Sequence, residues 1–169
     1  MVSLFRDWVL ALIVSLVVLL DQFTKYLVRV NLDLGESWPT QGLLRLTHGT
    51  NSGSAFGLFP DQTAILTVAS IVAIGFLFYI YKTYALTSLL LRFAVGLQLG
   101  GAFGNLIDRL RNGVVVDFID FGWWPVFNIA DSSIVVGITI LAGVLLFDRS
   151  KRSLISGPKD DNSLEGSLQ

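Results

Sequence analysis

The side chains that could do chemistry are carboxylates, amides and a few cations, gathered in short segments of an otherwise apolar chain. Two carboxylates that share a buried site cannot both ionise cheaply, so one keeps a proton while the other acts as a base. Such a pair can activate water against an amide, although proton-coupled transporters also keep aspartates in their spans. The candidates are Asp21 and Lys25, Asn51, Asn105 with Asp108 and Arg109, Asp117 and Asp120, and Asn128 with Asp131.

Composition removes several other chemistries. The chain has no cysteine, so it has no thiolate nucleophile, no disulfide and no Cys-ligated metal. Its single histidine, His48, is interpreted as a loop residue, because nothing nearby supplies a Ser-His-Asp triad and one histidine cannot build a His-rich zinc site. A net charge of -1 without a basic run is not typical of nucleic-acid binding. We therefore expect no metal, no cofactor and no nucleic-acid partner.

The elements that must position these side chains are membrane helices. Of 169 residues, 53% are hydrophobic and only 15% charged, and the mean hydropathy is +0.66. A hydrocarbon core of ~30 Å needs ~20 mostly apolar residues of helix. We predict one membrane α-helical domain over residues 1–155 and a disordered cytoplasmic tail at 156–169. The four predicted transmembrane helices cover residues 8–28, 62–81, 89–107 and 129–147.

The connections carry their own signals. The polar segment 31–61 is rich in glycine and indicates short strands and turns, and the VVVDFIDF stretch at 114–121 is β-prone. Gly96, Gly100 and Gly104 recur at every fourth position of the third predicted helix, so they share one stripe. We interpret that stripe as a packing seam for another helix, without a catalytic role.

Topology follows from the distribution of lysine and arginine. With both termini in the cytoplasm, seven of the 12 cations lie inside and five outside, which is a weak positive-inside bias. All the polar candidates then lie at the extracytoplasmic ends of the helices or in the two outer loops. A charge at membrane depth costs at least ~2.5 kcal/mol on insertion scales, so a one-sided cluster indicates a functional site.

Each candidate also has a structural interpretation. Asp21 and Lys25, four residues apart on a helix, could form an ion pair that lowers the cost of both charges, or could act in the site directly. Asp108 and Arg109 could be interfacial anchors, although we favour pairing with polar groups around the site.

The amides and the two loop aspartates are equally ambiguous. Asn105 and Asn128 could cap helices and bridge them, and Asn128 is a plausible N-cap, but amides that orient a carboxylate would look the same. Spacing alone cannot choose between Asp117 and Asp120 as the partner of Asp131.

Five sequence blocks together resemble the lipoprotein signal peptidase (signal peptidase II) family, in that family's order. Any one of them would be a weak signal, whereas the set is highly specific. The blocks are DQFTK at 21–25, NSGSAFG at 51–57, GGAFGNLIDR at 100–109, GVVVDFID at 113–120 and FNIAD at 127–131.

The resemblance implies a role for each candidate. The aspartates of the VVDF and FNxAD blocks, here Asp117 and Asp131, would be the catalytic dyad, and Asp120 would be dispensable; we expect Asp120 to be a solvated interfacial carboxylate. The residues implied to support the dyad or position the substrate are Asp21, Lys25, Asn51, Asn105, Asp108, Arg109 and Asn128.

The resemblance also implies a fold and a substrate. It implies four transmembrane helices with a small extracytoplasmic β-cradle, in the bacterial cytoplasmic membrane, with the active site near the outer face. The implied substrate is a prolipoprotein whose cysteine carries diacylglycerol, cut just before that cysteine. Membrane lipid is an expected partner, and inhibition by globomycin is expected.

The alternatives are a small proton-coupled transporter and an assembly factor without an active site. A transporter would carry polar residues near the midplane, often in a broken helix or an inverted repeat. The middle of the span at 62–81 is apolar and no repeat is visible. An assembly factor gives no reason for Asp131 to open a helix opposite an aspartate in a β-prone loop.

Overall fold

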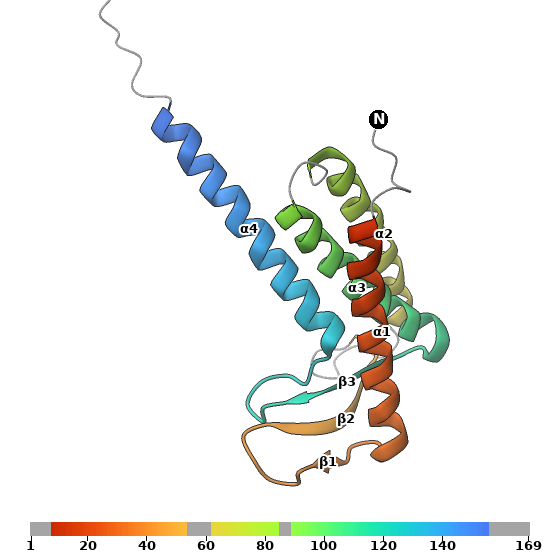
Figure 1. The fold of residues 1–169 in the computed structure, drawn as a ribbon. Helices are drawn as coiled ribbons and strands as arrows, with labels where there is room; N and C mark the ends of the chain where they lie inside the picture. The colour runs from red at the N-terminus through yellow and green to blue at the C-terminus, as the bar shows by residue number, and fades with distance from the viewer. Residues whose placement is uncertain (1–7, 54–61, 85–88, 156–169) are drawn as a thin grey trace, which may run out of the picture.

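The computed structural model describes residues 8–53, 62–84 and 89–155. The predicted tail at 156–169 and the last residues of the NSGSAFG block lie outside the described residues, so predictions about them stay predictions. A small sheet lies at one end of a helical bundle (Figure 1). The helices are α1 (Trp8–Asn31), α2 (Thr63–Tyr84), α3 (Leu89–Asn112) and α4 (Ile129–Ile155), and the strands are β1 (Ser37–Trp38), β2 (Arg45–Asn51) and β3 (Val115–Asp120).

The helices confirm the predicted spans, with longer ends. In the described part of the chain α1, α2 and α3 are each long and apolar enough to cross a membrane, whereas the apolar stretch of α4 is shorter, Ile129–Val144. Each helix begins within a residue of its predicted start and continues past its predicted end. The extensions are polar turns, because a helix goes on satisfying its own backbone hydrogen bonds beyond the hydrocarbon.

α3 is the central helix, and its neighbours α1, α2 and α4 pack around it. Its glycine stripe faces α1, as the predicted packing seam requires. A Cβ atom on Gly96 would lie 2.9 Å from Ile13, and one on Gly100 would lie 2.6 Å from Val17. Close approach of two backbones is what small residues permit in a membrane, and here it brings the polar ends of α1 and α3 together.

The predicted strands form one antiparallel sheet in the order β1-β2-β3. Arg45 pairs with Asp120 and Asn51 with Val115, with an irregularity between Leu46 and Gly49. The sheet packs on the end of α1 through a small core that contains Val28, Val116 and Phe118. This core places β3 beside the first turn of α4, which Figure 1 shows directly above the sheet.

The glycine seam can be tested with a matched pair of helical glycines. Gly100→Leu should lower the melting temperature in detergent strongly, because the new side chain meets Val17 and the Val14 carbonyl oxygen. Gly75→Leu in α2 should change it little, since a Cβ atom there has nothing within 4 Å. Gly113 is a poorer control, because its φ of 73° favours glycine. Equal melting temperatures would contradict the seam.

Candidate active site

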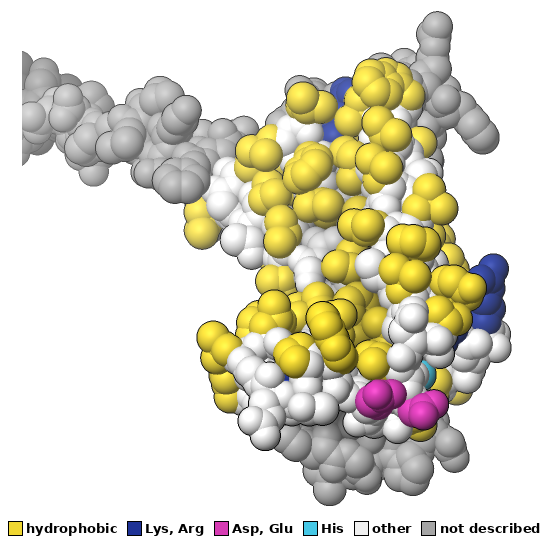
Figure 2. All heavy atoms as spheres, turned by 60° about the horizontal axis from the view of Figure 1, so that its bottom comes forward, with side chains coloured by type: hydrophobic (Ala, Val, Ile, Leu, Met, Phe, Trp, Pro, Cys, Tyr) yellow, Lys and Arg dark blue, Asp and Glu magenta, His cyan; other side chains and the backbone are white. Residues whose placement is uncertain are grey.

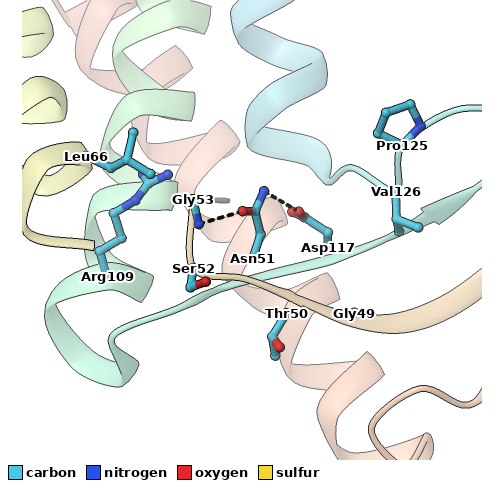
Figure 3. A pocket seen from close by; sticks show the side chains of 10 residues that line it. All are labelled: Gly49, Thr50, Asn51, Ser52, Gly53, Leu66, Arg109, Asp117, Pro125 and Val126. Atoms are coloured by element: carbon cyan, nitrogen blue, oxygen red, sulfur yellow. Dashed lines mark hydrogen bonds between the residues drawn. The ribbon is translucent and has the colours of Figure 1, made fainter. Parts of the chain in front are cut away.

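Asp117 lies buried in β3 with both carboxylate oxygens engaged. Oδ1 accepts a hydrogen bond of 2.6 Å from Asn128 Nδ2, and Oδ2 accepts one of 3.1 Å from Asn51 Nδ2. Figure 3 shows the Asn51 amide between the Gly53 backbone and Asp117, at the end of β2. The strand pairing that brings Asn51 to β3 therefore also orients Asp117.

Asp131 lies in the first turn of α4, and Asn128 caps that helix as predicted. The Asp131 N–H donates to Asn128 Oδ1 at 2.9 Å, and the Asn128 N–H donates to Asp131 Oδ2 at 3.4 Å. Asn105 Nδ2 donates to Asp131 Oδ1 at 2.7 Å. Asn128 thus contacts both carboxylates, that of Asp117 through its side-chain Nδ2 and that of Asp131 through its backbone N–H.

A buried ammonium fixes which way these amides point. Lys25 Nζ is fully buried and lies 2.8 Å from Asp21 Oδ2, 3.0 Å from Asp108 Oδ2 and 2.9 Å from Asn105 Oδ1. An ammonium can only donate, so the oxygen of Asn105 must face it and the NH₂ must face Asp131. The same oxygen accepts from Asn128 Nδ2 at 3.1 Å, which orients the second amide too.

The carboxylates around Lys25 join four elements, α1, α3, α4 and β3. Asp21 Oδ1 accepts from the Ala130 N–H at 3.0 Å, and Asp108 Oδ2 accepts from the Val116 N–H at 3.3 Å. The possible Asp21–Lys25 ion pair is thus present, and it tethers α1 to the first turn of α4. Asp108 is not an exposed anchor, because it is fully buried beside β3.

Gln22 and Arg29 were not among the predicted site residues, yet both contact the carboxylates around Lys25. Gln22 Nε2 lies within 3.2 Å of Asp21 Oδ2, the Gly104 carbonyl oxygen and Asp108 Oδ1. Arg29 Nη2 lies 3.5 Å from Asp108 Oδ1. Gln22 belongs to the DQFTK block at 21–25, and this position in the block could have identified it as a site residue.

A cavity of about 540 Å³ opens beside Asp117, between the sheet and the ends of α2 and α3. In Figure 3, Arg109 and Leu66 border one side of it and Pro125 and Val126 the other. Arg109 Nη1 makes a long contact of 3.4 Å with the Ser70 hydroxyl, so its guanidinium is placed by α2 rather than by the carboxylates. An extended peptide could lie in this cavity against Asp117.

The expectation that Asp120 is a solvated interfacial carboxylate was wrong. Only 5% of its surface is exposed. Oδ2 accepts from Arg45 Nη2 and from Thr47 Oγ1, both at 2.7 Å, and Oδ1 accepts from the Gly122 N–H at 2.6 Å. Asp120 lies three residues after Asp117, so the alternation of β3 places it on the opposite face of the sheet, where Arg45 and Thr47 of β2 contact its carboxylate.

The surroundings move the pKa values of the two loop aspartates in opposite directions. Burial, together with repulsion from Asp131, raises the pKa of Asp117 to about 6 despite its two amide hydrogen bonds. The hydrogen bond from Thr47 and, with it, the Gly122 N–H and the Arg45 cation hold the pKa of Asp120 below its ordinary value. A carboxyl whose pKa is raised beside a second carboxylate is suited to share the proton that an aspartyl pair needs to activate water. Within the described ranges no group of three or more His, Cys, Asp or Glu side chains is arranged to hold a metal ion.

This chain is similar to known proteins over most of its length. Residues 13–147 match the model of the Signal peptidase (SPase) II family. The lipoprotein signal peptidase of Halothermothrix orenii is 46% identical over 132 residues, covering 77% of this chain and 90% of that protein. That of Moorella thermoacetica is 43% identical over 80% of this chain and 91% of its own.

A solved structure shares the fold as well. It is a bacterial membrane enzyme determined by the in meso method at 2.3 Å resolution, with a TM-score of 0.80 and 32% identity over 92% of this chain and 95% of that one.

The opposite pKa shifts predict opposite pH dependences. The raised pKa of Asp117 stabilises the folded state below its unfolded value of 3.8, and this contribution is lost as the pH rises through about 6. The depressed pKa of Asp120 contributes stability above its unfolded value, and this is lost as the pH falls through the folded pKa.

The melting temperatures of the unaltered protein and of each variant are measured between about pH 3 and pH 7, and the variant's value is subtracted from that of the unaltered protein. This difference in melting temperature should shrink for Asp117→Asn as the pH rises, whereas for Asp120→Asn it should grow. Parallel curves for the two variants would contradict the assigned environments.

Proposed function

This chain belongs to the signal peptidase II family, and we propose that Asp117 and Asp131 are its catalytic pair. It is a multi-pass bacterial membrane enzyme, an aspartic-type peptidase that removes signal peptides from prolipoproteins. The observation that carries the assignment of the pair is that Asn128 contacts both carboxylates, Asp117 through its side-chain Nδ2 and Asp131 through its backbone N–H, with Asp117 on the wall of the cavity.

In the proposed reaction the pair shares one proton. The environment of Asp117 raises its pKa, so Asp117 is the member that we assign as the acid and Asp131 the one that we assign as the base. Asp131 takes a proton from water as the water oxygen attacks the peptide carbonyl carbon, and Asp117 gives its proton to the carbonyl oxygen. When the C–N bond breaks, the amine takes the proton from Asp131 and the diol returns one to Asp117.

The other site residues would hold the pair in this state. Asn51, Asn105 and Asn128 donate to the carboxylates and keep them oriented. Arg109, which borders the cavity, would donate to carbonyl groups of the bound peptide. The remaining site residues, Asp21, Lys25 and Asp108, would fix the orientation of the Asn105 amide and, through it, that of Asn128.

The substrate follows from the membrane setting. We propose that the prolipoprotein carries diacylglycerol on the cysteine after the scissile bond, so that its acyl chains stay in the bilayer while the bond reaches the cavity. Cleavage would release the signal peptide just before that cysteine. Globomycin is expected to inhibit by occupying the same cavity.

The dyad predicts a specific pattern of mutational effects. Asp117→Asn and Asp131→Asn should each lower the rate of cleavage of a lipidated precursor by orders of magnitude, because an amide cannot exchange the proton. Asp120→Asn should keep most of the activity and lose stability instead, since its carboxylate bonds Arg45 and Thr47.

Purified variants are compared for signal-peptide release, with thermal melting as the folding control. Substantial activity in a folded Asp117→Asn or Asp131→Asn protein would refute the aspartyl mechanism. Loss of activity confined to a folded Asp120→Asn protein would mean that the dyad is misassigned.

We further propose that both termini are cytoplasmic and that the sheet and the dyad are extracytoplasmic. The chain has no cysteine, so single cysteines at Ser37, in β1, and at Ser163 report each side cleanly. In intact cells an impermeant thiol reagent should label the Ser37→Cys protein and spare the Ser163→Cys protein. The reverse pattern would overturn the topology.

A further inference from the structure

A second cavity lies away from the dyad, where the end of α1 meets β1 and β2. Its volume is about 340 Å³ and its wall is largely apolar. The lining residues are Leu27, Val28, Asn31, Leu32, Trp38 and Leu46. The hydrogen-bond partners of Asp117 and Asp131 described for the active site are all other residues, and the proposed reaction does not use this cavity.

The position of the cavity along α1 sets its depth. The 24 residues of α1 span about 36 Å at ~1.5 Å per residue, a little more than a hydrocarbon core of ~30 Å. Leu27 and Asn31 belong to the final turns of that helix. The cavity is therefore level with the boundary between hydrocarbon and headgroups, where tryptophan is enriched.

The exposed apolar surface of α1 leads into this cavity, in whose wall Asn31 is the one side chain with an amide. Phe23, Tyr26 and Val30 are exposed on the helix, Leu27 is both exposed and part of the cavity wall, and Trp38 on β1 is 67% exposed. Figure 2 shows hydrophobic side chains that cover the helices and continue onto the end of the molecule where the sheet lies. A surface continuous with a membrane-spanning face is covered by the same solvent, the bilayer.

We propose that this cavity holds an acyl chain of a bilayer phospholipid, which seats the sheet in the headgroup region. The chain enters from the leaflet on the sheet side, past Leu27, and lies between α1 and the β1–β2 pair, against Trp38 and Leu46. Burial of apolar surface on both partners stabilises the contact at roughly 25 cal/mol per Å². The sheet that carries Asn51 and Asp117 is thereby held at a fixed depth.

Fluorescence quenching tests the proposal without any substrate, so bilayer phospholipid is the only source of acyl chains. Trp8, Trp123 and Trp124 are changed to Phe, which leaves Trp38 as the one tryptophan of the chain. The protein is placed in nanodiscs of phosphatidylcholine brominated near the ester or near the chain end. Trp38 should lose most of its emission to bromine near the ester, less to bromine near the chain end, and little to aqueous acrylamide.

Two leucine variants separate the cavity from the general surface. Leu46→Glu alters the cavity wall and should restore most of the Trp38 emission. Leu43→Glu, at a residue that is 78% exposed and outside the lining, should leave the quenching unchanged. If Leu46→Glu does not fold, Leu46→Gln takes its place.

Three results would overturn the proposal. Quenching by acrylamide alone would place Trp38 in water, and protection from both quenchers would mean that protein fills the cavity. An equal effect of Leu43→Glu and Leu46→Glu would place the lipid on the surface rather than in the cavity.

Discussion

The structure depends on one buried charge, the ammonium of Lys25. A lysine in the outer part of a membrane helix is tolerable only with partners, and Asp21 and Asp108 both lie within 3.0 Å of it. Removing one partner of such a buried pair typically costs ~3–5 kcal/mol, because the other charge is left uncompensated. The close packing of α1 on the glycines of α3 is what brings the three charges together.

From this cluster a defined order of hydrogen bonds reaches the carboxylates. Lys25 settles the orientation of Asn105, Asn105 settles that of Asn128, and the two amides donate to Asp131 and Asp117. Amides suit this relay because they carry a donor and an acceptor on one rigid plane and stay neutral. The carboxylates can then share a proton while their neighbours keep a fixed polarity.

Much of this arrangement could be predicted from the sequence, because the bilayer imposes strong constraints. Apolar runs placed the helices, Asn128 before Ile129 predicted the cap, and the β-prone stretch around Asp117 predicted β3. The ends of all four helices were underestimated, since polar turns beyond the hydrocarbon carry no hydropathy signal. Asp120 was misjudged because its partners, Arg45 and Thr47, come from a distant strand whose register the sequence does not reveal. The contact of Ser70 with Arg109 was missed because the sequence does not show which faces of α2 and α3 meet.

The cap at Asn128 has a consequence for the assembly of the candidate site. This one residue ends the strand-to-helix connection, begins α4 and holds both carboxylates, and Ala130 in the same turn is tied to Asp21 of α1. The site therefore consists of parts from α1, α3 and α4, which lie far apart in the sequence. Without the packing of α4 on α1 and α3, Asp131 would lack the Asn105 amide and Asp117 would face no second carboxylate. The proposed pair is thus a product of tertiary packing in the membrane, and a change that loosens α4 should separate the two carboxylates without touching either one.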